Sequence, residues 1–326
     1  MSACLVLLLT LSAGPQAQTA AALPPAEYGF GLKPQEAAEG WISLFDGKTT
    51  FGWKDAKVAE GGLTGGQTTS EFGRYLLHAE VVKPGTISLA GKPKSVTAGE
   101  FRFEHTGPRG AIALGEGLVL RSLTIRPLEL KPLFNGRDMT GWQRIDRQTI
   151  PAEKRPSWKV DDGGLRAVGG PGAVEHPGLF GDFVLQVDVR TRAKEANGGV
   201  FFRSRPGDFM NGYEAQVYNR CEDNDPGKPS TYSTGSLDDR QLARRLVSRD
   251  NETFRMTVIA VGPHISTWVN GHQLTDWTDT REKHDNPRQG LRTDPGTLQL
   301  QAHDPQTDVE FRAVNIAALD SPRSSP

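Results

Sequence analysis

Alternation of apolar and polar residues along the chain predicts many short β-strands and almost no helix. Residues 182–190 alternate strictly, with large apolar side chains on one face, as the two-residue period of a strand requires. Residues 253–271 contain two such runs separated by Gly262 and Pro263, which predicts a hairpin. Helical periodicity is confined to residues 238–248. The pattern is that of an all-β sandwich.

Three of the predicted strands carry polar side chains on one face and apolar side chains on the other. Residues 197–204 and 212–218 are expected to be two strands joined by a turn, and residues 298–303 a third strand. Polar side chains above an apolar face are what a polar groove on a packed sandwich requires. The side chains that the two-residue period places on the polar faces are those of Phe201, Arg203, Glu214, Gln216, Tyr218, Gln299, Gln301 and His303.

Two segments of the chain repeat each other and indicate two related β domains. Residues 44–53 read LFDGKTTFGW, and residues 133–142 read LFNGRDMTGW. Each copy continues with a similar turn, VAEGGL or VDDGGL, and ends with a similar strand. We therefore predict a smaller, truncated sandwich at residues 41–130 and a full sandwich at residues 131–319. The first copy has no counterpart of the polar strands, so we expect it to lack the groove chemistry.

The N-terminal residues predict export from the cytoplasm. Residues 4–14 form an apolar run of signal-peptide length, too short to span a membrane, and small residues follow it. We expect a signal peptide at residues 1–22, a periplasmic or extracellular mature chain, and no membrane attachment; the alternative is a buried N-terminal strand. Residues 23–40 are expected to form a linker and residues 320–326 a disordered tail.

Charge and cysteine content exclude several classes of partner. A formal net charge of -1 gives no general attraction to nucleic acid or to anionic membranes. The basic run at residues 240–249 is interpreted as a short solvated helix. Loss of Cys4 with the signal peptide would leave Cys221 as the one cysteine, so no intrachain disulfide and no thiolate metal cluster is expected.

The sequence predicts no cofactor. It contains no HExxH motif, no paired cysteines and no glycine-rich phosphate loop that opens a helix. Asp161, Asp162 and residues 222–225 are rich in oxygen ligands and are candidates for a structural calcium ion, although a solvated acidic turn is the simpler interpretation.

The second copy resembles the 3-keto-disaccharide hydrolase family, which was long catalogued as a domain of unknown function. The resemblance is carried by nine short motifs that follow one another in the family's order. They are LFNGRDMTGW, WKVDDGGL, GDFVLQVDVR, NGGVFFRS, GYEAQV, TGSL, WVNG, LQLQAH and VEFRAVNI. Two departures concern substrate preference: Asp238 follows TGSL where the family usually has an aromatic residue, and residues 251–254 replace a Trp-Asn pair.

The resemblance implies a concanavalin A-like jelly roll whose concave face binds sugar and acts on glycosides already oxidised to a ketone at C3. Such a ketone acidifies the hydrogen at C2, so one base can remove it, the group at C1 can leave, and water can then add. This route needs a base, an acid and a donor for the enolate oxygen. A separate oxidoreductase would supply the ketone.

The expected roles are divided among eight residues. Glu214 and His303 would act as base and acid in either order, with Arg203 as the cation at the developing oxyanion. Each has a structural alternative: a solvated carboxylate, a surface histidine, and an ion pair of Arg203 with Glu214 across the strands. The expected substrate-binding residues are Asn197, Gln216, Gln301, Tyr218 and Asp188.

Two other functions remain open on the sequence alone. The scaffold would also suit a lectin-like module that binds glycan without cleaving it. A conventional glycosidase needs two carboxylates that flank the bond. The groove offers one clear carboxylate, Glu214, and Asp188 as a second only if its strand face is the concave one.

Overall fold

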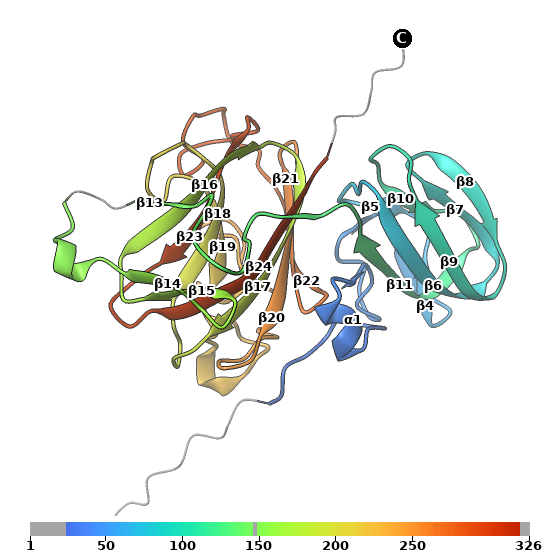
Figure 1. Cartoon of the computed structure of the whole chain (residues 1–326). Coiled ribbons are helices and arrows are strands. Elements are labelled where there is room, and N and C mark those ends of the chain that lie inside the picture. The colour runs from blue at the N-terminus through green and yellow to red at the C-terminus, as the bar shows by residue number, and fades with distance from the viewer. Residues whose placement is uncertain (1–23, 146–148, 320–326) are drawn as a thin grey trace, which may run out of the picture.

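The computed structural model describes residues 24–145 and 149–319 and folds them into two β-sandwiches (Figure 1). The expected signal peptide and C-terminal tail lie outside the described residues. Within these described residues, helix is limited to α1 (Pro34–Ala38) and to two single turns, η1 (Ala152–Lys154) and η2 (Glu222–Asn224). None of the helices in the described part of the chain has the length and hydropathy to cross a membrane. The predicted all-β class is confirmed.

The second sandwich, called the jelly roll below, packs an eight-stranded sheet against a five-stranded one. The larger sheet has the order β14-β15-β24-β17-β20-β21-β22, with β12 paired to β24, and the smaller has the order β13-β16-β23-β18-β19. Antiparallel sheets packed in this way form a concanavalin A-like sandwich. Its strands are β12 (Lys131–Pro132), β13 (Gln143–Ile145), β14 (Ser157–Asp161), β15 (Gly164–Val168), β16 (Gly172–Phe180), β17 (Phe183–Thr191), β18 (Gly198–Ser204), β19 (Tyr213–Val217), β20 (Phe254–Val261), β21 (His264–Val269), β22 (His272–Thr278), β23 (Gly296–Ala302) and β24 (Asp308–Ala318).

The first sandwich, called the first unit below, is smaller and contains two sheets of its own. Their orders are β3-β4-β11-β6-β9, with β1 paired to β11, and β2-β5-β10-β7-β8. Its strands are β1 (Ile42–Ser43), β2 (Trp53–Lys54), β3 (Lys57–Ala59), β4 (Gly62–Thr64), β5 (Gln67–Thr68), β6 (Tyr75–Lys83), β7 (Gly85–Leu89), β8 (Lys92–Val96), β9 (Gly99–His105), β10 (Ile112–Leu114) and β11 (Val119–Pro127).

The two sandwiches have the same strand order. Strands β1 to β9 correspond one by one to β12 to β20, and β10 and β11 correspond to β23 and β24. The repeated tryptophans also make the same contact, since Trp53 and Trp142 donate their indole N–H groups to the carbonyls of Leu44 and Leu133. This correspondence supports the predicted repeat. The jelly roll differs by the hairpin β21–β22 and by two long loops, residues 218–253 and 279–295.

The first unit packs on the outer face of the eight-stranded sheet (Figure 1). Val184, Ile259 and Trp268 project from that face and belong to the hydrophobic cluster of the first unit. Trp268 is fully buried, and its indole N–H donates to the carbonyl of Ser43 at 3.0 Å. The two units therefore share one apolar interface.

Trp268→Phe is expected to lower the free energy of unfolding by about 1–3 kcal/mol, because the buried carbonyl of Ser43 loses its donor. Urea unfolding of the whole chain measures the change. Trp277→Phe is the control, since its indole N–H makes no hydrogen bond to the described residues around it. An equal loss in both variants would contradict the role given to the Ser43 contact.

The basic run at residues 240–249 is not a helix, so that prediction is wrong. Its arginines instead bind the N-terminal arm and the first unit. Arg244 pairs with Asp46 at 2.6 Å, and Arg245 pairs with Glu27 at 2.5 Å. These contacts between distant parts of the chain outweigh local helix propensity and hold the arm along the jelly roll.

Candidate active site

The outer face of the five-stranded sheet of the jelly roll, called the groove face below, carries two rows of mostly polar side chains. Strand register sets each row, because cross-strand partners on one face are neighbours. One row crosses β19, β18, β23, β16 and β13 as Gln216, Gly199, Gln301, Ala173 and Ile145. The next row is Glu214, Phe201, Gln299, Glu175 and Gln143.

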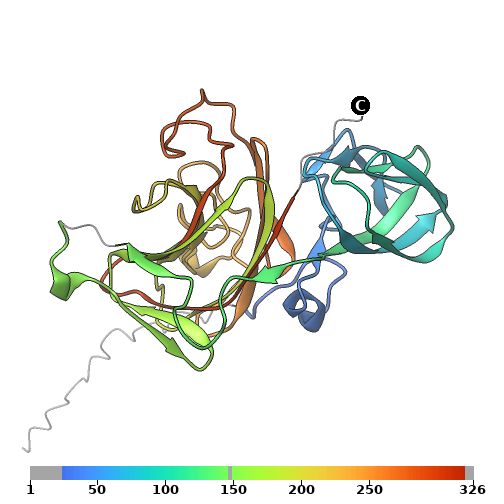
Figure 2. The ribbon, with the colours of Figure 1, turned by 45° about the horizontal axis from the view of Figure 1, so that its top comes forward.

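Two loops cover the groove face. The turn between β18 and β19 is held down by Gln299, which accepts from the amide of Met210 at 3.1 Å and donates to the carbonyl of Asp208 at 2.9 Å. Loop 279–295 rises at the end of the jelly roll and supplies Arg288 (Figure 2). Arg288 donates to the carbonyl of Met210 at 3.4 Å and so joins the two loops. The two loops together therefore cover the middle of the groove face.

Glu214 lies in an ion cluster under this cover. Its side chain is 2% exposed, and its Oε2 accepts from Nη2 of Arg288 at 2.7 Å. Arg288 also pairs with Asp238, which accepts from Nε2 of Gln216 at 3.0 Å. The guanidinium carbon lies 5.3 Å from the ring centre of Phe201, within the range of a cation–π contact. One arginine thus bridges two carboxylates that come from different segments.

Burial raises the pKa of Glu214 to about 8, with the nearby Asp238 acting in the same direction and Arg288 opposing both. A carboxyl group with this pKa is largely protonated at neutral pH and is a strong base once ionised. Groups of this kind, buried beside a specific charge, are typical of catalytic acids and bases.

Three acceptor oxygens in this cluster have no hydrogen-bond partner among the described residues: Oε1 of Glu214, Oε1 of Gln216 and Oε1 of Gln301. The residue between them in the register is Gly199. A Cβ atom there would lie 2.3 Å from Oε1 of Glu214 and 3.0 Å from Oε1 of Gln301, so only glycine lets these two side chains lie against the strand. Buried unpaired acceptors are costly and indicate a place for donors from a ligand, such as sugar hydroxyls.

Residues 129–317 match the family described as the 3-keto-alpha-glucoside-1,2-lyase-like domain. The chain belongs to this family. The match covers the jelly roll and not the first unit, so the interpretation of the first unit as a partial copy of the family stays a prediction. Membership supports a carbohydrate-active, glycoside-acting domain in residues 129–317.

Known structures include relatives of low similarity, and no curated protein matches the chain. A "putative glycosyl hydrolase" from Parabacteroides distasonis ATCC 8503 is 22% identical, with 59% of this chain and 94% of that chain covered and a TM-score of 0.45. The carbohydrate-binding module CBM66 from Bacillus subtilis is 16% identical, with 55% and 97% covered and a TM-score of 0.40.

Arg203 does not face the groove of this 3-keto-alpha-glucoside-1,2-lyase-like domain, and its expected role as oxyanion donor is not compatible with its position. Its φ of +49° and a register shift between Phe201 and Ser204 mark a bulge that breaks the two-residue period. The fully buried guanidinium donates to the carbonyls of Gly181, Gly262 and Arg292 and to the carboxylate of Asp182. Arg203 therefore holds loops together.

Asp188 is also outside the groove. It lies on β17 in the other sheet, on the face that carries Val184 and Gln186 toward the first unit. Its carboxylate forms a two-point ion pair with Arg255, at 2.5 and 2.6 Å. Asp188 therefore lies on the wrong sheet to contact a substrate in the groove or to serve there as a second carboxylate.

His303, Asn197 and Tyr218 share the groove side but lie just beyond the ends of their strands. His303 follows β23 and lies four residues after Gln299, which belongs to the row of Glu214, or about 13 Å along the strand direction. Its imidazole is 46% exposed and contacts Asp304 at 3.3 Å. The structure therefore brings Glu214, Gln216 and Gln301 together and leaves these three residues at the rim.

Sequence periodicity missed three residues of the site. Arg288 comes from a long loop without any strand pattern, so no local signal points to it. Asp238 was visible as a departure from the family pattern after TGSL. Glu175 alternates with Val174 on β16 and is 1% exposed; it accepts from Thr297 at 2.6 Å and from Gln143 at 2.8 Å.

Among residues 24–145 and 149–319, no group of three or more His, Cys, Asp or Glu side chains is arranged to hold a metal ion. At the two calcium candidates, Asp162 pairs with Arg312 at 2.8 Å and Asp223 with Lys228 at 3.2 Å.

Proposed function

We propose that the jelly roll cleaves 3-keto-glycosides by elimination and hydration, with Glu214 as the group that moves the proton. The observation that carries this proposal is a sealed carboxyl group of raised pKa beside an arginine, with one unpaired oxygen of its own and two more on Gln216 and Gln301. Family membership supports the substrate class.

Ionised Glu214 takes the proton from C2 of the sugar, and the electron pair of the C–H bond moves into an enolate with the C3 oxygen. The enolate then expels the oxygen substituent at C1, which receives the proton from Glu214, and leaves a double bond between C1 and C2. Addition of water across this bond gives the 3-keto sugar. One carboxyl group can serve both proton transfers, so His303 is not needed at the reacting atoms.

Arg288 takes the part first expected of Arg203. It is the cation beside Glu214 and lies where negative charge passes from the carboxylate to the enolate. Oε1 of Gln216 and Oε1 of Gln301 accept hydrogen bonds from sugar hydroxyls on the same side. Gly199, which has no side chain, lets the Glu214 carboxylate and the Gln301 amide lie side by side against the strand.

Access to Glu214 requires movement of the cover. Its Oε1 is buried, and Arg288 and Met210 lie over it. Loop opening before binding and closure before reaction are common in enzymes whose chemistry must exclude water. For this elimination, a closed site protects the enolate from protonation by solvent.

The value of kcat/KM for a chromogenic 3-keto-glucoside is expected to rise with pH through an apparent pKa near 8. The sign follows from the raised pKa of Glu214, because only the ionised form accepts the C2 proton and its fraction grows as pH rises through that value. A pH–rate profile measures it. A profile that falls above pH 8 would assign Glu214 as acid instead, and one that is flat from pH 6 to 9 would remove it from the proton transfer.

We also propose that the mature chain is exported and acts on sugars oxidised by a separate oxidoreductase, with no metal or organic cofactor of its own. The support is the apolar run at residues 4–14 and the need for a ketone that the site itself cannot make.

A further inference from the structure

The first unit contacts the jelly roll at the base of loop 279–295, the loop that carries Arg288. At the start of the loop, Oγ1 of Thr69 in the first unit donates to Asp276 on β22 at 2.7 Å. Three residues later, Asp279 accepts from the hydroxyl of Tyr213 at 2.7 Å. Tyr213 precedes Glu214 on β19, so this end of the loop is fixed beside the site.

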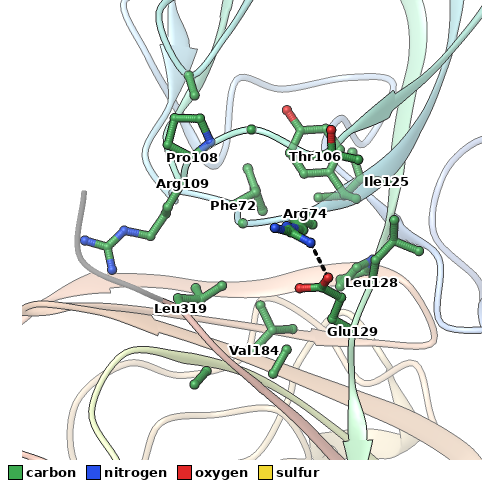
Figure 3. A pocket seen from close by; sticks show the side chains of 17 residues that line it. Phe72, Arg74, Thr106, Pro108, Arg109, Ile125, Leu128, Glu129, Val184 and Leu319 are labelled. Carbon is green, nitrogen blue, oxygen red and sulfur yellow. Dashed lines mark hydrogen bonds and ion pairs between the residues drawn. The ribbon is translucent and has the colours of Figure 1, made fainter. Parts of the chain in front are cut away.

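At the other end of the loop, a chain of hydrogen bonds begins at Arg109. Arg109 reaches from the first unit toward the jelly roll beside a cavity of about 640 Å³ between the units (Figure 3). Its Nη1 donates to Oδ2 of Asp182 at 2.6 Å, and Oδ1 of Asp182 accepts from Arg203 at 3.1 Å. Arg203 in turn donates to the carbonyl of Arg292 at 3.1 Å.

Arg292 is four residues after Arg288, and its amide donates to the hydroxyl of Tyr213 at 3.0 Å. Both backbone groups of Arg292 are therefore hydrogen-bonded: its amide to Tyr213 of β19 and its carbonyl to Arg203 of β18. Arg109 fixes the second oxygen of the carboxylate that orients Arg203. Its own side chain is 8% exposed, so water competes little for this contact.

We propose that Arg109 is a positioning residue, through which the first unit fixes loop 279–295 so that Arg288 meets Glu214. The effect on activity rests on the proposed function, whereas the effect on the loop does not. Strands β7, β8 and β10 of the first unit correspond to the groove strands β18, β19 and β23 but carry no carboxylate. The proposal gives the first unit a structural role in place of a catalytic one. Contiguous hydrogen bonds that end on a loop are a physical route for such coupling.

Hydrogen–deuterium exchange of the whole chain tests the coupling without substrate. In Arg109→Gln, amides of residues 286–293 are expected to exchange about tenfold faster, while those of β6, β17 and β20 keep the wild-type rate. Arg109→Lys keeps a charge at Asp182 and is expected to recover most of the protection. Arg74→Gln is the matched control: Arg74 lines the same cavity but pairs with the exposed Glu129.

The kinetics of Arg109→Gln on the 3-keto-glucoside provide a second, independent measurement. Arg109→Gln is expected to lower kcat about tenfold with little change in KM, because misplacement of Arg288 affects the reacting atoms more than binding. Unchanged exchange in residues 286–293, or equally faster exchange in every strand, would overturn the proposal. If the wild type turns over no 3-keto sugar, the proposed function fails while the exchange result still decides the role of Arg109.

Discussion

Glu214→Gln is expected to lower kcat on a chromogenic 3-keto-glucoside by about 10²–10⁴-fold, with a much smaller change in KM. The amide keeps the size of the side chain and its contact with Arg288 but cannot accept the C2 proton. The raised pKa of Glu214 makes this loss large, since the wild-type carboxylate is a stronger base than an exposed one.

Glu310→Gln is the matched control for this variant. Glu310 is as deeply buried and pairs with Arg192 at 2.8 Å, but it lies on β24 in the other sheet. Its loss is expected to cost stability and to leave kcat per folded molecule within about twofold. Equal activity losses in Glu214→Gln and Glu310→Gln would mean that the effect is structural and that Glu214 is not the proton-transfer group.

Arg203→Met is expected to lower the free energy of unfolding by about 3–5 kcal/mol, because three backbone carbonyls and one side of Asp182 lose the donor that the buried guanidinium provides. Methionine fills much of the volume but offers no N–H group. Urea unfolding of the whole chain measures the change.

The opposite pattern of effects would support the role of oxyanion donor that sequence periodicity predicts for Arg203. If Arg203 faced the groove as an oxyanion donor, its replacement would reduce kcat and leave stability nearly unchanged. Arg288→Met provides the comparison, because Arg288 is the cation that the structure places beside Glu214. We expect Arg288→Met to affect kcat more and stability less than Arg203→Met does.

The two-residue period predicted part of the groove because strand register enforces it. Glu214 and Gln216 on β19 and Gln301 on β23 occupy regular, fully paired stretches, so alternation alone places them on one face. The repeated turn and tryptophan motifs could be recognised in the sequence for a related reason. The two segments that carry them fold with the same strand order, and both tryptophans make the same contact.

The same rule failed where the backbone leaves the regular strand. A positive φ at Arg203 turns its side chain away from Glu214, and nothing in the residue types nearby marks this bulge. Alternation on β17 was correct for Asp188, but it cannot say which face of which sheet is concave. Arg288 depends on tertiary contacts of a loop, which local patterns do not encode.

Side-by-side turnover of a 3-keto-glucoside and its unoxidised parent glucoside is the most direct test of the chemistry assigned to the groove. We predict cleavage of the keto form and no measurable cleavage of the parent, because only the ketone acidifies the C2 hydrogen that Glu214 removes. Cleavage of the parent at a comparable rate, or saturable binding of the keto form without any turnover, would contradict elimination at this site.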